Sequence, residues 1–141
     1  PTDSVIICQP NDDTIAHMGE LSAETLKYKG VKGYIVDGGC RDVDFILKLG
    51  FPVFCKYFTP SDVVCRWKIT SLGEPIKIGN LTIKSGDYVL GDIDGVVIIP
   101  QEIAKEVIKE TEDYINTESQ LRKDILSGVD PKEAYLKYRV F

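Results

Sequence analysis

Residues 33–42 read Gly-Tyr-Ile-Val-Asp-Gly-Gly-Cys-Arg-Asp, and this stretch decides the fold. It predicts a strand over residues 33–37, and the sequence after it predicts a short helix over residues 43–49. The surrounding residues 4–56 read strand, helix, strand, helix, strand, which predicts a parallel sheet with right-handed crossovers. Ligands of such sheets bind beyond the carboxyl ends of the strands, so the predicted loop over residues 37–42 lies at a ligand-binding edge.

The flanking segments supply one more strand and three more helices. Residues 4–8 (Ser-Val-Ile-Ile-Cys) predict a buried strand. Apolar residues at a loose helical spacing predict a helix over residues 15–29, which Gly30 ends. A similar period predicts a long helix over residues 102–127 and a short final helix over residues 132–137.

Residues 63–100 differ in character, because short apolar runs alternate there with turn signals built from Gly, Asn and Asp. This pattern predicts an antiparallel β-rich section. The sole tryptophan, Trp67, shares one face of a predicted strand with Val63 and Cys65, and it is expected in the core. Asp94-Gly95 is interpreted as a tight hairpin turn and not as part of a metal site.

The bulk composition of the chain narrows the possible functions. The chain has 141 residues, a net charge of -5 and a pI of about 4.9. Because phosphate binding needs a concentrated basic patch, this charge argues against a nucleic-acid partner. No apolar run approaches the roughly 18 residues of a membrane span, so no membrane partner is expected. The four cysteines lack CxxC or zinc spacing, which predicts small buried hydrophobes in a reducing cytoplasm.

The segment around Arg41 and Asp42 is the most informative for chemistry. Gly38 and Gly39 would let backbone N–H groups approach a ligand closely. Arg41 offers a forked donor suited to a carboxylate, and Asp42 offers a hard oxygen ligand for a divalent metal. The alternative is a strand-to-helix turn in which Asp42 caps the helix and Arg41 is a solvated neighbour.

A second candidate element is Gly19-Glu20-Leu21-Ser22. If Gly19 interrupts the predicted helix, the backbone N–H groups of Leu21 and Ser22 become anion donors at a helix start. Taken alone, Glu20 is equally compatible with an ordinary surface position on a helix. The only histidine, His17, is interpreted as structural or as a neighbour of this site.

Blocks along the whole chain resemble one known family. The chain is similar to the 4-hydroxy-4-methyl-2-oxoglutarate aldolase family, the class II pyruvate aldolases, also known as the regulator-of-ribonuclease-activity-A-like (RraA-like) family. The likeness extends over residues 2–141. The blocks that carry it are residues 19–22, 30–33, 36–38, 40–44, 51–54, 59–60, 85–92 and 94–100.

The resemblance implies a fold and an assembly. The implied fold is α/β, an α/β/α sandwich of the swivelling (phosphohistidine-domain-like) type with a β-rich section and C-terminal helices. Residues 1–141 are then one RraA-like aldolase domain that lacks its N-terminal segment. The family forms homotrimers or pairs of trimers (homohexamers), so active sites at subunit interfaces are expected.

The resemblance also implies roles for individual residues. Asp42 would bind Mg²⁺ or Mn²⁺, Arg41 would bind the pyruvyl oxygens and stabilise enolate charge, and Glu20 would position a water molecule of the metal's shell. Substrate-binding groups are expected at Gly19, Leu21, Ser22 and Arg41. A further acid is expected from the C-terminal helix of a neighbouring subunit, and Glu118 is the best match.

The sequence departs from the family at one catalytic position. Active members carry an acid three residues after the Arg-Asp aspartate, where this chain has Phe45, and the nearest acid is Asp44. The expected function is a metal-dependent lyase that cleaves 4-hydroxy-2-keto acids to pyruvate, with oxaloacetate decarboxylation as a side activity. The alternative is a non-enzymatic regulator that binds a ribonuclease or another RNA-degradation partner.

Overall fold

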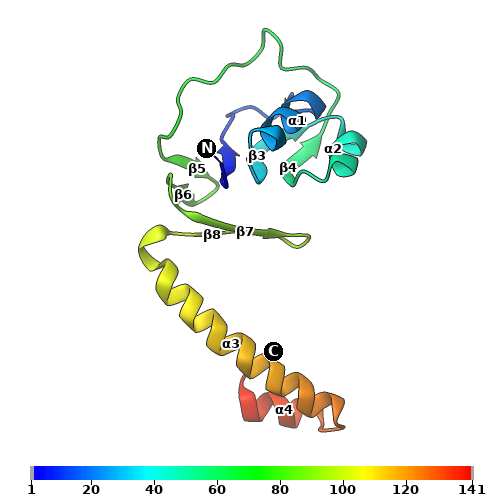
Figure 1. The fold of residues 1–141 in the computed structure, drawn as a ribbon, viewed down its shortest axis with the longest axis vertical. Coiled ribbons are helices and arrows are strands. Elements are labelled where there is room, and N and C mark those ends of the chain that lie inside the picture. Colours follow the sequence, from blue (N-terminus) through cyan, green and yellow to red (C-terminus); the bar gives the residue numbers. More distant parts are fainter. Residues whose placement is uncertain (1, 141) are drawn as a thin grey trace. The chain divides into compact units, whose positions relative to one another are not determined.

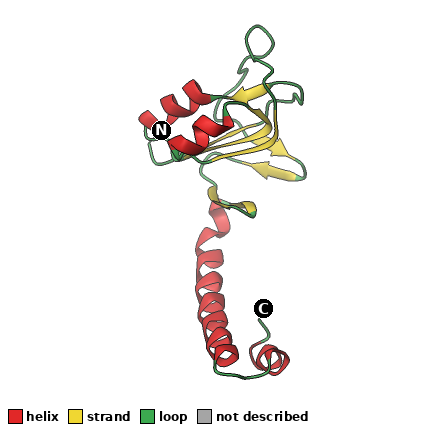
Figure 2. Ribbon diagram, turned by 90° about the vertical axis from the view of Figure 1, so that its right-hand side faces the viewer, coloured by secondary structure: helices red, strands yellow, loops and turns green. Residues whose placement is uncertain are grey.

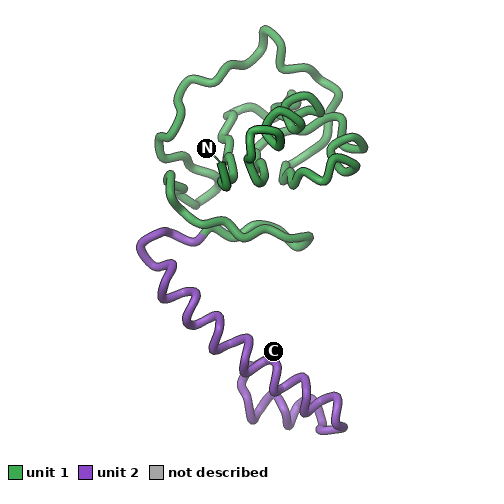
Figure 3. Tube along the Cα trace, viewed as in Figure 1, with its two compact units in different colours: residues 1–98 green, residues 99–141 purple. Residues whose placement is uncertain are grey.

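The computed structural model describes residues 2–140. The chain divides into two compact units, Pro1–Ile98 and Ile99–Phe141, which are drawn in different colours in Figure 3. The two units are treated separately below. Within the described residues, none of the helices has the length and apolar character needed to cross a membrane.

The first unit is built on a four-stranded parallel sheet, as predicted (Figure 1). Its strands are β1 (Val5–Cys8), β2 (Ala16–Met18), β3 (Gly33–Cys40) and β4 (Val53–Phe58). The longest strand, β3, is central: β1 pairs with its first half and β2 with its end, while β4 pairs along its other edge. The carboxyl ends of β2, β3 and β4 therefore lie together.

Helices α1 (Glu20–Tyr28) and α2 (Val43–Leu49) connect these strands and lie against the same face of the sheet (Figures 1 and 2). Apolar side chains from both helices and from β3 form one buried cluster. Its members are Met18, Ala23, Val31, Tyr34, Val36, Cys40, Ile46 and Phe51. This cluster fixes the backbone that leads into Arg41.

The predicted helix over residues 15–29 is wrong in its first part. Residues Ala16–Met18 form β2, and the helix begins only at Glu20. Gly19 is extended (φ −146°, ψ −177°), which separates the two elements. Ile15 and Met18 are buried as the apolar pattern required, but β2 makes its hydrogen bonds with β3 and not within a helix.

The predicted loop over residues 37–42 is also shorter than expected, because β3 continues through both glycines to Cys40. Gly39 pairs with Tyr57 of β4 and with Ala16 of β2. The strand therefore delivers Arg41 and Asp42 directly from the sheet edge.

The β-rich section forms two hairpins instead of the continuous series expected. Strands β5 (Ile76–Ile78) and β6 (Leu81–Ile83) pair antiparallel, and β7 (Tyr88–Asp92) pairs with β8 (Gly95–Ile99). The predicted turn before Gly95 is confirmed: Asp92 Oδ1 accepts from the backbone N–H groups of Asp94 (2.8 Å) and Gly95 (3.3 Å).

The predicted strand over residues 63–69 is absent, since these residues belong to a long irregular connection between β4 and β5 (Figure 1). Cys65 lies in a turn with φ 60° and is exposed, so the expectation of a buried thiol fails there. Cys40 is buried, whereas Cys8 and Cys55 are half-buried. Trp67 is half-buried, and its Nε1 donates to the Pro10 carbonyl at 2.9 Å.

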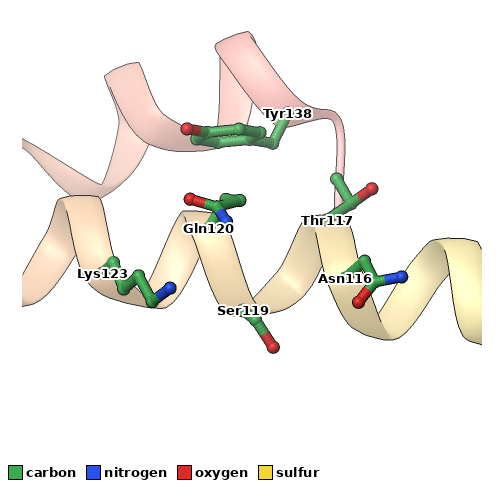
Figure 4. A pocket seen from close by; sticks show the side chains of 6 residues that line it. All are labelled: Asn116, Thr117, Ser119, Gln120, Lys123 and Tyr138. Carbon is green, nitrogen blue, oxygen red and sulfur yellow. The ribbon is translucent and has the colours of Figure 1, made fainter.

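The second unit is a helical hairpin that follows the predicted pattern closely. A 3₁₀ turn η1 (Gln101–Ile103) leads into α3 (Ala104–Leu126), and α4 (Pro131–Tyr138) folds back on it. Asp130 caps α4 by accepting from the backbone N–H groups of Lys132 (2.9 Å) and Glu133 (3.3 Å). Figure 4 shows a polar pocket in this unit; its lining residues are Asn116, Thr117, Ser119, Gln120, Lys123 and Tyr138.

Candidate active site

The candidate site lies where β3 ends and α1 begins. The Arg41 N–H donates to the Met18 carbonyl at 2.9 Å, which holds the end of β3 beside the end of β2. The backbone N–H of Glu20, at the start of α1, donates to Asp42 Oδ2 at 3.0 Å. The structure thus brings together the two segments, 22 residues apart, that the sequence predicts as one site.

Gly19 is required here by close approach and not by unusual dihedral angles. A Cβ at this position would lie 2.8 Å from Asp42 Oδ2 and 3.0 Å from Arg41 Nε. Any side chain at residue 19 would therefore push the Arg41 and Asp42 side chains away from the start of α1.

Asp42 adopts the left-handed conformation (φ 57°, ψ 36°) and makes no side-chain capping bond to α2. Its Oδ2 is directed to the N-terminus of α1 instead. The alternative in which Asp42 serves only as the cap of the following helix is therefore wrong. Its carboxylate belongs to the junction between the two segments, where about a third of the side chain (34%) is exposed.

The Arg41 guanidinium lies between two carboxylates. Its Nη1 donates to Asp62 Oδ2 at 2.7 Å, and its Nε lies 3.5 Å from Asp42 Oδ2. The hydrogen bond from Asp62 is the main reason that the pKa of Arg41 is raised, with smaller contributions from Asp42 and Glu20. A permanent positive charge is therefore held at the sheet edge.

Sequence reasoning missed Asp62. It follows β4 in the irregular connection, where no periodicity marks it, and it contacts Arg41 across 21 residues. The only signal nearby is the Thr59-Pro60 block of the family resemblance.

The start of α1 offers further hydrogen-bond donors. The first N–H groups of a helix have no partner within the helix. Here the N–H of Glu20 is bound by Asp42 and that of Ala23 by the Gly19 carbonyl. Among the hydrogen bonds found within residues 2–140, none uses the N–H of Leu21 or Ser22 as donor, so both are available to an anion.

The donor set fits a divalent cation that also takes ligands from substrate and water. Across residues 2–140, no group of three or more His, Cys, Asp or Glu side chains could hold a metal unaided. Mg²⁺ commonly uses one or two protein carboxylates and completes its shell with water and substrate oxygens. Asp42 provides such a carboxylate, since the contacts described for its side chain all involve Oδ2.

Three further acidic or substituted positions lie apart from this cluster. Asp44 pairs with Lys48 at 2.6 Å on the surface of α2, and Phe45 is 39% exposed. Glu118 belongs to α3 in the second unit, where its Oε1 accepts from Arg122 Nη2 at 2.8 Å. Neither Asp44 nor Phe45 makes a described contact with the Arg41 or Asp42 side chains.

The two glycines of β3 serve packing and not the ligand approach that the sequence suggested. A Cβ on Gly38 would lie 2.6 Å from His17 Nδ1, and one on Gly39 would lie 2.5 Å from both the Ile15 carbonyl and the Tyr57 ring. The His17 side chain has no exposed surface and packs edge-on against Trp67. Burial lowers the pKa of His17, although Asp12 opposes that shift, so the ring is a neutral structural element.

Comparisons with known proteins agree with this geometry. A family model described as RraA-like, Aldolase/RraA, matches residues 1–98. A protein of Halalkalibacterium halodurans with the name "Putative 4-hydroxy-4-methyl-2-oxoglutarate aldolase" is 31% identical over 140 residues. That match covers 97% of this chain and 65% of the relative.

Two solved structures share the fold. An uncharacterized protein from Pseudomonas syringae pv. tomato superposes with a TM-score of 0.93 at 27% identity, over 98% of this chain and 65% of its own. Streptomyces coelicolor RraAS2, described as an unusual member of the RNase ES inhibitor RraA protein family, gives 0.74 at 26% identity, over 86% and 63%. This chain thus spans just under two thirds of the length of these relatives, and it belongs to the RraA-like (Aldolase/RraA) family.

Proposed function

We propose that this chain carries the site of a divalent-metal-dependent lyase. It cleaves 4-hydroxy-2-keto acids of the 4-hydroxy-4-methyl-2-oxoglutarate type to pyruvate, and it decarboxylates oxaloacetate as a side activity. The observation that supports this most directly is the convergence of Arg41, Asp42 and the N-terminus of α1 at one sheet edge. We further propose a cytoplasmic homotrimer or homohexamer in which each domain completes a swivelling α/β/α sandwich.

The substrate carboxylate is the anion that suits the start of α1. The N–H groups of Leu21 and Ser22 point along the helix axis, where the helix dipole favours negative charge. Arg41 supplies a fixed positive charge from the side of the sheet. A 2-keto acid bound by both would have its keto group near the guanidinium.

The local charge explains why a cation is needed. Glu20, Asp42 and Asp62 contribute three negative charges and Arg41 one positive charge, which leaves an excess of two negative charges. An anionic keto acid would be repelled by this excess. Mg²⁺ or Mn²⁺ held by Asp42 removes the excess and, when bound, supplies Lewis-acid polarisation of the keto oxygen.

The residues of this chain then divide the work of carbon–carbon bond cleavage. When the bond between C3 and C4 of the substrate breaks, its electron pair moves into the pyruvate enolate. Arg41 stabilises the negative charge that develops on the enolate oxygen. Glu20 holds a water molecule that takes the proton of the C4 hydroxyl group. Loss of CO₂ from oxaloacetate leaves the same enolate, which accounts for the side activity.

The test is pyruvate release from oxaloacetate by the full-length protein, with Mg²⁺ or Mn²⁺ and with a chelator. We expect metal-dependent turnover that falls about 100-fold or more in Asp42→Ala and in Arg41→Ala. Asp37→Asn is the matched control, because Asp37 forms an ion pair with Lys56 at 3.0 Å on the same sheet. Undiminished turnover in Arg41→Ala would overturn the proposal. A folded, metal-loaded protein without turnover would favour the non-enzymatic regulator that binds an RNA-degradation partner.

A further inference from the structure

We propose that Asp62 is a positioning residue of the site: it holds the Arg41 guanidinium and thereby keeps the Asp42 carboxylate available to the cation. This inference rests on the proposed function, which assigns the cation to Asp42. It adds a residue from the irregular connection after β4 to a site otherwise made by β3 and α1.

The first argument is the division of the guanidinium between two acids. Arg41 Nη1 donates to Asp62 Oδ2 at 2.7 Å, which is a short charge-assisted bond. The contact from Arg41 Nε to Asp42 Oδ2 is longer, at 3.5 Å. Asp62 is therefore the stronger partner, although Asp42 is the immediate neighbour of Arg41 in the chain.

This division matters because arginine and an aspartate readily form a bidentate pair. Without Asp62, the guanidinium would be free to rotate onto both oxygens of Asp42. Such a pair would cover the carboxylate that the cation requires and would remove the positive charge from the substrate. Asp62 thus competes for Arg41 in favour of the cation.

The second argument is that Asp62 is itself anchored. Its Oδ1 accepts from the Val64 N–H at 2.9 Å, so the two carboxylate oxygens have separate tasks. The carbonyl of Ser61 accepts from the Ala16 N–H at 2.9 Å, which ties the residue before Asp62 to β2. The pKa of Asp62 is lowered by the Val64 N–H and by Arg41, consistent with a permanently charged partner.

A third contact secures the same segment further along the chain. Trp67 Nε1 donates to the Pro10 carbonyl at 2.9 Å, and the indole ring packs against His17. Arg66 Nη1 donates to Ser61 Oγ at 2.8 Å. A connection without helix or strand is therefore fixed at the residues on both sides of Asp62.

The experiment compares Asp62→Asn and Asp62→Glu with the matched control Asp37→Asn. The readouts are thermal unfolding, Mn²⁺ affinity measured with the metal alone, and kcat and KM for oxaloacetate. We expect Asp62→Asn to weaken Mn²⁺ binding about 10-fold and to lower kcat about 10-fold or more, with an unchanged melting temperature. Asp62→Glu should recover part of both, and Asp37→Asn should change neither.

A double-mutant cycle separates positioning from a general structural effect. In an Arg41→Gln background the proposed competition no longer exists, so adding Asp62→Asn should not weaken Mn²⁺ binding further. Wild-type Mn²⁺ affinity and kcat in a folded Asp62→Asn protein would overturn the positioning role while leaving the lyase intact. Weakened Mn²⁺ binding in Asp62→Asn, in a protein that shows no turnover at all, would support the positioning role and contradict the lyase.

Discussion

The parallel sheet of the first unit and the helical hairpin of the second are stabilised by different contacts. In the first unit, backbone and side chains meet at van der Waals distance around Gly38 and Gly39, and a contiguous apolar cluster lies beneath the site. In the second, the buried hydrophobic residues are few: Ala104, Leu121, Ala134 and Val140. The difference teaches that the predicted chemistry sits where the backbone has the least freedom, while the hairpin depends on replaceable side-chain contacts.

Adding one methyl group to each unit should give the largest contrast. Gly39→Ala would place a Cβ 2.5 Å from the Ile15 carbonyl, so we expect loss of several kcal/mol, about 3 or more, or failure to fold. Gly128→Ala meets nothing within 4 Å and suffers only from its φ of +100°, which costs about 1–2 kcal/mol. Chemical denaturation measures both. Equal losses in the two variants would remove the contrast.

The second prediction asks whether the helical unit takes part in chemistry. If Glu118 supplies an acid to the site of a neighbouring chain, Glu118→Gln should lower kcat about 10- to 100-fold. The exposed Glu118–Arg122 pair contributes little to stability, so unfolding should hardly change.

Mixing two inactive variants tests the origin of that acid. Chains with Glu118→Gln and chains with Asp42→Ala each lack a different part of the site. If the acid comes from a neighbour, mixed assemblies contain some sites with both parts, and turnover should partly return. Full activity of Glu118→Gln alone would show that the second unit contributes no acid.

The third prediction concerns pH and the first unit. Because burial lowers the pKa of His17, the unfolded chain takes up a proton below about pH 6.5 while the folded chain does not. The free energy of unfolding should therefore decrease as the pH falls from about 6.5 towards the lowered pKa. Denaturant titrations at pH 7.5 and 5.5 should show a smaller decrease in His17→Gln. An identical decrease in that variant would assign the effect to other groups.

The smallest expected effect lies in the hairpin. Asp124 Oδ2 accepts from Lys137 Nζ at 2.8 Å and from the Tyr138 hydroxyl at 3.0 Å, which joins α3 to α4. Asp124→Asn should speed amide hydrogen exchange in α4 and leave the sheet unchanged. Altered exchange in β3 would mean that the two units are coupled more strongly than their separate contacts indicate.

The elements that depend on local pattern were predictable from sequence. Helix α2, the two C-terminal helices and the turn before Gly95 follow their apolar period or turn residues. Residues Ala16–Met18 were assigned to a helix because Ile15 and Met18 fit a helical period as well as they fit a buried strand. Their strand character comes from pairing with β3, which a local pattern does not contain.

The site was predictable where it depends on chain neighbours and not where it depends on distant contacts. Arg41 and Asp42 are adjacent, and Glu20 follows the glycine that starts α1, so all three were found. Asp62 was missed because its role arises from an irregular segment held by Ala16 and Pro10, which are far from it in sequence. The glycines of β3 were found for the wrong reason, since they accommodate His17 and Tyr57.

The backbone of Asp42 has an evolutionary consequence. Its left-handed conformation (φ 57°) costs an L-residue with a side chain about 1–2 kcal/mol, and glycine adopts it almost freely. A descendant released from selection for catalysis would therefore become more stable by exchanging this aspartate for glycine. Drift at this single turn would be biased towards loss of the carboxylate. The residue found there in a related chain is thus a record of whether its lineage still performs the chemistry.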